Sequence, residues 1–293
     1  MAKSNKFIIP AALSLILAAC INNNHDEAQP LVCVSIDPQK WILEQIVGDR
    51  MTVVSLMPSE ANPENFDPPV SALRQASDAE AYMLVGHLPW EQSLTERIAD
   101  SNKDIKIVDT SRGINLIAGT HGHTHDGEEP EFDPHTWSSV KNVRIIAQNM
   151  TDAVIQIDSA NADYYNTNFQ RLIVRLDSLD NSFTNRLAPL KGEPVLVWHP
   201  SLSYFARDYG LEQIAIGAEN KETTLKAMQH KISLAASKRP KVFFVQPQMD
   251  GAQNLQIIEA TGARKVVLHS LDYDWMAEME KITDSLTDSL TAQ

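Results

Sequence analysis

Residues 159–188 read SANADYYNTNFQRLIVRLDSLDNSFTNRLA and contain neither glycine nor proline. Apolar side chains recur along this stretch every three or four positions, at Tyr165, Phe169, Leu172, Leu176, Leu179, Phe183 and Leu187. The spacing predicts one amphipathic helix of roughly 45 Å, longer than a small domain is wide. Pro189 and Gly192 end it. A coiled-coil dimer is the alternative, but the flanking charges lack coiled-coil regularity, so we expect a monomer with the helix packed along its own chain.

Short β-rich runs lie on both sides of this helix and alternate with helical patterns. The predicted strands are Leu31 to Ile36, Met51 to Leu56, Tyr82 to Val85, Ile105 to Val108, Val195 to Trp198, Gln213 to Ile216, Val242 to Val245 and Lys265 to Leu268. Such alternation is typical of parallel sheets with helical crossovers. We therefore predict an α/β protein of two lobes, residues 31–158 and 190–293, each with a roughly four-stranded, mainly parallel sheet flanked by helices. The connecting helix spans 159–189, and the binding site lies in the cleft between the lobes.

Composition narrows the function. The 293 residues carry 38 acidic and 25 basic side chains, a formal charge of −13, with 43% hydrophobic residues. This is a globular composition, and its charge argues against sequence-independent binding of nucleic acids. Cys20 and Cys33 are too few for a four-thiolate zinc site or a disulfide framework. A bound metal would therefore need histidine and carboxylate ligands.

The first residues have the pattern of an export signal. Lys3 and Lys6 precede an apolar run from Phe7 to Ala19, which is too short to span a bilayer. The run ends in Leu17-Ala18-Ala19-Cys20, which resembles the lipobox of bacterial lipoproteins. We expect residues 1–19 to be a signal peptide and 20–30 a polar tether lipidated at Cys20, on an exported periplasmic or cell-surface lipoprotein. A plain secretory signal is the alternative. Removing the two lysines takes the formal charge from −13 to −15.

Histidines follow two predicted strands and one rigid turn. His199 and His269 come directly after strands of the second lobe, and parallel sheets bind ligands at the carboxyl ends of their strands. His135 stands in Asp133-Pro134-His135-Thr136-Trp137, and Glu64 in Asn62-Pro63-Glu64. Three imidazoles and one carboxylate would suit zinc or a similar divalent metal.

Several motifs and their order along the chain resemble those of the metal receptors of ABC importers. These receptors are the cluster A-I substrate-binding proteins, which capture zinc or manganese. The specific segments are Asp133-Pro134-His135-Thr136-Trp137 and His199-Pro200-Ser201-Leu202-Ser203-Tyr204-Phe205, with the long helix between them. Gly86-His87-Leu88-Pro89-Trp90-Glu91 and Thr261-Gly262-Ala263 also match, so the resemblance runs from Leu31 to about Leu286. It implies a receptor without enzymatic activity that delivers its metal to a membrane permease.

By this resemblance, His135 and His199 match metal ligands of the family directly. Glu64 stands where the family usually has His, and His269 where it usually has Asp, so the inventory of three His and one acid is retained. Asn65 and Asp67 are alternatives for the first position. Zinc receptors of the family carry His at the position of His199 and manganese receptors a carboxylate, which favours Zn²⁺ over Mn²⁺. Gln246 stands where the family often has Glu and is expected to lie just behind the ligands.

The segment His121-Gly122-His123-Thr124-His125 resembles the His-rich loop of zinc receptors and could hold an auxiliary metal ion, or be a solvated loop.

Three alternative interpretations of the whole protein remain open. The metal site could have lost Glu64 and His269 as ligands. The protein could be a metal-dependent hydrolase, although the long helix has no place in a (β/α)8 barrel. It could also be an adhesion or interaction lipoprotein that retains only the receptor fold.

Overall fold

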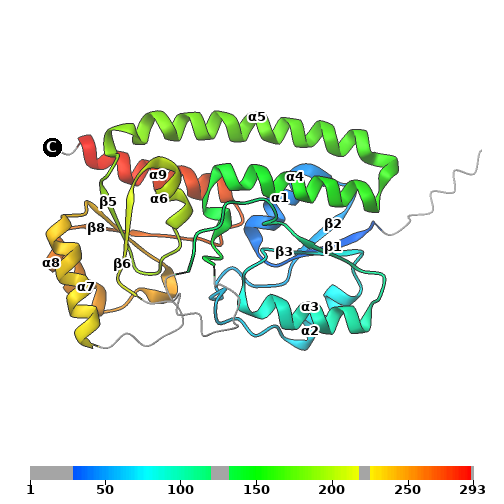
Figure 1. Ribbon diagram of the computed structural model, residues 1–293, viewed down its shortest axis with the longest axis horizontal. Helices are drawn as coiled ribbons and strands as arrows, with labels where there is room; N and C mark the ends of the chain where they lie inside the picture. The colour runs from blue at the N-terminus through cyan, green and yellow to red at the C-terminus, as the bar shows by residue number, and fades with distance from the viewer. Residues whose placement is uncertain (1–28, 120–131, 218–224, 292–293) are drawn as a thin grey trace, which may run out of the picture.

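The protein consists of two parallel-sheet lobes beneath one long helix (Figure 1). The computed structural model describes residues 29–119, 132–217 and 225–291. The N-terminal sheet contains β1 (Leu31–Val34), β2 (Thr52–Ser55), β3 (Ala81–Leu84) and β4 (Lys106–Asp109). The C-terminal sheet contains β5 (Pro194–Val197), β6 (Glu212–Ala215), β7 (Val242–Val245) and β8 (Arg264–Val267). The predicted fold class is confirmed.

The two sheets have the same strand order. The N-terminal sheet runs β2-β1-β3-β4 and the C-terminal sheet β6-β5-β7-β8, with every pairing parallel. In each sheet the strand order reverses beside the first strand, between β1 and β3 and between β5 and β7. We call these two places the N-terminal and the C-terminal switch point. Loops leaving the carboxyl ends of these strands diverge there, which makes the point a natural binding crevice.

Helices cover both faces of each sheet. In the N-terminal lobe they are α1 (Asp37–Val47), α2 (Val70–Ser77), α3 (Pro89–Ser101) and α4 (Val140–Ile157). In the C-terminal lobe they are α6 (Ser203–Tyr209), α7 (Leu225–Lys238), α8 (Gln253–Thr261) and α9 (Trp275–Thr291). Figure 1 shows α1, α4, α6 and α9 on the side of the long helix, while α2, α3, α7 and α8 lie farther from it. No helix within the described residues is long and apolar enough to cross a membrane.

The long helix, α5 (Ala162–Leu187), has 26 residues and lies over both lobes (Figure 1). It buries the seven apolar residues predicted from the sequence and packs on α1 and α4 of one lobe and α9 of the other. Its first predicted turn is instead the 3-10 helix η2 (Ser159–Asn161), where the Asp158 carboxylate accepts hydrogen bonds from Asn161 Nδ2 and the Tyr165 hydroxyl at 2.7 and 2.6 Å. The 3-10 helix η3 (Ala188–Leu190) follows at Pro189.

One apolar core extends through both lobes along α5. Near its C-terminal end, Phe183 packs edge-on against Phe205 and Tyr209 of α6, with ring centroids 6.3 and 5.9 Å apart. A smaller cluster lies on the side of the C-terminal sheet that faces α7 and α8 and includes Phe243 and Ile257. The lobes also meet at Trp41 and Trp275, whose rings are 5.7 Å apart. These contacts join the two lobes on either side of the cleft.

Candidate metal centre

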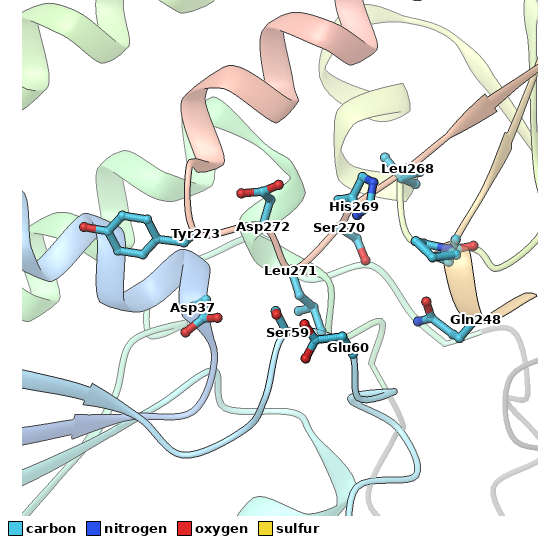
Figure 2. Close-up of a pocket in the computed structure, with 12 residues that line it drawn as sticks. Asp37, Ser59, Glu60, Gln248, Leu268, His269, Ser270, Leu271, Asp272 and Tyr273 are labelled. Carbon is cyan, nitrogen blue, oxygen red and sulfur yellow. The ribbon is translucent and has the colours of Figure 1, made fainter.

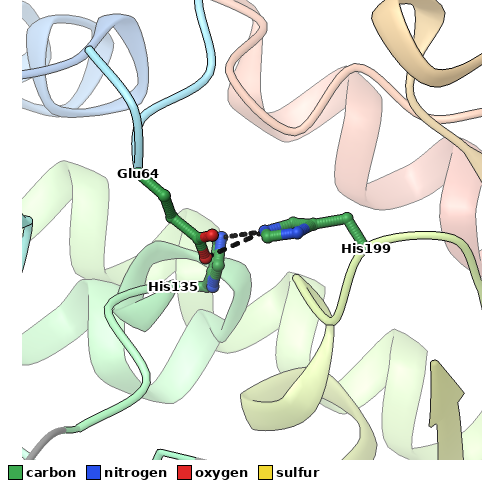
Figure 3. A group of neighbouring side chains, drawn as sticks. All are labelled: Glu64, His135 and His199. Carbon is green, nitrogen blue, oxygen red and sulfur yellow. Dashed lines mark hydrogen bonds and ion pairs between the residues drawn. The ribbon is translucent and has the colours of Figure 1, made fainter. Parts of the chain in front are cut away.

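Glu64, His135 and His199 converge between the lobes (Figure 3). One ligand atom from each lies within 4.8 Å of the others. The Nε2 atoms of His199 and His135 are 3.1 Å apart, and His199 Nε2 is 3.2 Å from Glu64 Oε1. Glu64 and His135 are buried, and His199 is nearly so. The N-terminal lobe supplies the first two residues and the C-terminal lobe the third, so the group spans the cleft.

The loop after β2 carries Glu64. The Glu64 backbone N–H donates to Asn62 Oδ1 at 3.0 Å, which closes a tight turn at Pro63. Trp90, in the first turn of α3, donates from its indole N–H to the Pro63 carbonyl at 2.9 Å. These bonds fix the backbone of the turn and direct the carboxylate of Glu64 into the cleft. Asn65 and Asp67, the alternatives from sequence, are exposed.

Asp133 orients His135. Its Oδ1 lies 2.9 Å from both the backbone nitrogen and the ring Nδ1 of His135. A proton on Nδ1 that points to a carboxylate leaves Nε2 with its lone pair toward the centre, as in many metal sites. The Tyr204 hydroxyl donates to the Asp133 carbonyl at 2.7 Å and fixes the turn from the other lobe. Asp133 was not among the predicted site residues. Its position two residues before His135 in the Asp-Pro-His motif was the sequence feature that could have indicated its role.

The Asp133 carboxylate is ionised despite its burial. Burial alone raises its pKa, but hydrogen bonds from the ring and the backbone of His135 and from Ser203 oppose that effect and hold the pKa below its ordinary value. An ionised Asp133 makes the imidazole of His135 a better electron donor. This favours binding of a cation at Nε2.

His199 follows β5 at the C-terminal switch point. The Ser201 backbone N–H donates to the His199 carbonyl at 2.7 Å and closes the turn that directs the ring into the cleft. The rings of His199 and His135 meet edge-on, with centroids 4.9 Å apart.

The geometry of the three residues fits a transition metal. Zinc ligands at about 2.0–2.1 Å from the ion are separated by about 3.3–3.4 Å along a tetrahedral edge, close to the spacings found here. Glu64 Oε1 is buried, and within the described residues it accepts no hydrogen bond but makes an ion-pair contact with His199 Nε2, which neutralises it only if that ring carries a second proton. A buried carboxylate oxygen without a donor is costly unless a cation neutralises it. The donor set of two imidazoles and a carboxylate is one that zinc prefers.

His269 lies outside this group. Its side chain is exposed and lines a cavity of about 580 Å³ beside the metal centre, together with Asp37, Glu60 and Asp272 (Figure 2). The His269 backbone N–H donates to Glu278 Oε1 at 2.7 Å, and Trp137 Nε1 donates to the Ser270 carbonyl at 2.7 Å. These bonds fix the backbone on both sides of the ring. His269 as a ligand stays a prediction that requires the ring to turn inward.

Gln246 lies close to the group of Glu64, His135 and His199. It is buried directly after β7 and lines a small cavity together with His135 and His199. The segment containing His121, His123 and His125, and the residue Cys20, fall outside the described residues.

Comparison with known proteins identifies the family. The model of the family described as the periplasmic component A of the zinc-uptake complex matches residues 32–289. The chain belongs to this family. This confirms the resemblance inferred from the sequence motifs.

Individual relatives agree with this membership. The chain is 24% identical to the high-affinity zinc uptake system protein ZnuA of Bacillus subtilis, over 98% of this chain and 97% of that protein. It is 23% identical to the zinc-binding lipoprotein AdcA of Streptococcus pneumoniae, over 92% of this chain but only 56% of AdcA. The chain thus spans about half the length of that relative. A crystal structure of ZnuA is 30% identical and superposes with a TM-score of 0.82, covering 89% of this chain and 99% of the other.

Proposed function

We propose that this protein captures a divalent transition-metal ion, zinc, outside the cytoplasm and delivers it to the membrane permease of an ABC importer. The convergence of Glu64, His135 and His199 from two lobes carries the proposal. An ion held by both lobes makes the loaded form of the cleft different from the empty one, which is what a permease must recognise. The family membership and the zinc-related names of the relatives support the same function.

The ligand types favour zinc over manganese. Imidazole nitrogen suits zinc, whereas manganese prefers a larger set of carboxylate and water oxygens. Two of the three residues in the group are histidines. Zinc bound at a hundredfold excess over its dissociation constant stabilises a protein by about 2.7 kcal/mol. Zinc should therefore raise the melting temperature of chelator-treated protein clearly, and more than manganese at equal concentration. No shift with zinc would reject the proposed function.

The site assignment has its own test. His199→Ala should reduce zinc affinity measured by titration calorimetry by more than about 100-fold, since loss of a ligand exceeds the 10–100-fold typical of losing an outer partner. His230→Ala, which changes an exposed histidine of α7, is the matched control and should bind like the wild type. Deletion of residues 121–129 should also spare the tight site. Equal losses in the three variants would place the tight site elsewhere.

The lipid anchor is part of the proposal. Leu17-Ala18-Ala19-Cys20 resembles a lipobox, and AdcA bears the name of a lipoprotein. Cys20→Ser should release the protein from the membrane fraction of the producing bacterium without changing zinc affinity. Retention of the Ser variant in that fraction would contradict the anchor.

The proposed role is binding without catalysis. The three converging side chains can all serve as ligands, and the Asp133 carboxylate contacts the Nδ1 atom of His135, where it orients the ring for binding. Zinc-loaded protein should be recovered with zinc bound and should not hydrolyse esters, amides or phosphate esters. Turnover that disappears in His199→Ala would favour the hydrolase alternative.

A further inference from the structure

Gln246 occupies the C-terminal switch point next to His199. It follows β7, while His199 lies just beyond β5, and these strands are neighbours in the sheet. Its side chain is 3% exposed. Gln246 lines both the small cavity that contains His135 and His199 and the larger cavity of about 580 Å³ that contains His269, so it borders the two.

The hydrogen bonds of Ser201 determine which way the Gln246 amide faces. The Ser201 hydroxyl donates to the His199 carbonyl at 3.4 Å, and Gln246 Nε2 donates to Ser201 Oγ at 3.1 Å. In this arrangement the single hydroxyl proton of Ser201 points to the carbonyl, and Oγ accepts from the amide. The amide nitrogen therefore faces Ser201, and Oε1 is the atom left over.

Gln246 Oε1 is a buried acceptor without a donor. It has no hydrogen-bond partner within the described residues. Buried polar atoms are nearly always hydrogen-bonded to protein or to ordered water, so an exception requires an explanation. The small cavity that Gln246 shares with His135 and His199 has a volume of about 10 Å³, room for about one water molecule. An unpaired oxygen, the ligand histidines and this space thus lie together.

We propose that Gln246 positions a metal-bound water. This inference rests on the proposed function, since Glu64, His135 and His199 supply three ligands and tetrahedral zinc takes a fourth. The water fills that position and donates a hydrogen bond to Gln246 Oε1. Binding to zinc makes water a stronger donor, which suits a neutral amide acceptor that cannot remove the proton. Gln246 acts through the water, and His269 need not reach the ion.

Zinc titration of Gln246 variants tests the proposal. Gln246→Leu removes the acceptor and should weaken zinc binding about 10- to 100-fold, the usual loss for an outer partner of a metal site. Gln246→Glu keeps an oxygen acceptor and should bind at least as tightly as the wild type. Gln248→Leu is the matched control, because Gln248 lines the same two cavities but is exposed. It should leave the affinity unchanged.

Several outcomes would overturn the proposal. Wild-type affinity in Gln246→Leu would show that the oxygen has no part in binding. Equal losses of zinc affinity in the Leu and Glu variants would mean that Gln246 acts only through its hydrogen bond to Ser201. A loss of zinc affinity in His269→Ala as large as in His199→Ala would give the fourth position to an imidazole.

A second variant tests the proposal if Gln246→Leu fails to fold. Gln246→Asn, which withdraws the oxygen by one methylene, should show an intermediate loss of zinc affinity. Wild-type affinity in this variant would also reject the water. A wild type that binds no zinc would instead reject the proposed function itself.

Discussion

The two lobes have the same strand order but opposite structures at their switch points. In the N-terminal lobe, the buried carboxylate of Glu91 accepts hydrogen bonds from the backbone N–H groups of Val85, Gly86 and Leu88 at 2.7, 2.9 and 3.3 Å, and from the Ser35 hydroxyl. In the C-terminal lobe, the Gln246 oxygen accepts nothing within the described residues, and His199 faces the cleft. One switch point is closed by the chain itself and the other is open to a ligand.

The strand order creates a crevice in each lobe, and the side chains at the crevice determine whether a ligand can bind there. Glu91 fills the crevice between β1 and β3, and the N-terminal lobe supplies its two members of the group from loops, with Glu64 after β2 and His135 beyond β4. The C-terminal lobe supplies His199 directly from the end of β5. Each lobe thus contributes to the group of Glu64, His135 and His199 by a different route. The closed switch point supports the Glu64 turn through α3 and Trp90.

The largest expected effect tests whether the lobes share one core. Phe183→Ala removes a buried ring that joins α5 to α6 and should cost about 3–5 kcal/mol of unfolding free energy. Val174→Ala, on the same helix but 68% exposed, should change it by less than about 0.5 kcal/mol. Urea unfolding, followed separately by tryptophan fluorescence and by circular dichroism, measures both. Two separate transitions, with only one shifted by Phe183→Ala, would mean that the lobes unfold independently.

A somewhat smaller effect tests the closed switch point. Glu91→Gln places an NH₂ group against donors that now meet a carboxylate oxygen, and should cost about 2–4 kcal/mol. The metal-free Gln246→Leu variant should lose only about 1 kcal/mol, because it gives up the one bond from the amide nitrogen to Ser201, while the wild-type Oε1 accepts no hydrogen bond from the described residues. Denaturant unfolding in chelator compares the two. Similar losses would erase the distinction between a closed and an open end.

The pH dependence of the unfolding free energy gives a second test of Glu91 at the closed switch point. Burial raises the pKa of Glu91 from 4.5 to about 7, although hydrogen bonds from Ser35 and from backbone N–H groups oppose the shift. The folded state then binds this proton more tightly than the unfolded chain. The stability that Glu91 contributes is complete below pH 4.5 and lost as the pH rises through about 7. The stability gap between wild type and Glu91→Gln should therefore narrow over this range, whereas a constant gap would refute the raised pKa.

The smallest effect is expected at the periphery of the C-terminal lobe. The pair of Lys238 and Glu212 is exposed, with Nζ 2.9 Å from Oε2. Exposed pairs contribute about 0–1 kcal/mol, so Glu212→Gln should change the unfolding free energy by less than about 1 kcal/mol and zinc affinity not at all. Thermal unfolding and zinc calorimetry check both expectations, and a large change in either would show that distant charges reach the cleft.

The fold was predictable because its signals are local. Alternating strands and helices indicated parallel sheets, and the apolar stripe of residues 159–188 indicated α5. The start of α5 was less predictable, since residues 159–161 continue the helical sequence pattern but form the separate 3-10 turn η2.

The site was predictable only in part. His135 and His199 stood out because rigid turns and strand ends place them, and Glu64 followed from the motif. The placement of His269 depends on backbone bonds to Glu278 and Trp137, which are distant contacts without a sequence signature. The closure of the N-terminal switch point by Glu91 is likewise a tertiary feature, because only the fold brings Ser35 to that carboxylate.

The location of zinc in crystals of the loaded protein, measured by anomalous scattering at the zinc edge, tests the central claim most directly. The account predicts one strong peak between the lobes, about 2.0–2.2 Å from the Nε2 atoms of His135 and His199 and from a carboxylate oxygen of Glu64. A peak only at His121 to His125, or one in the cleft without Glu64, would contradict it.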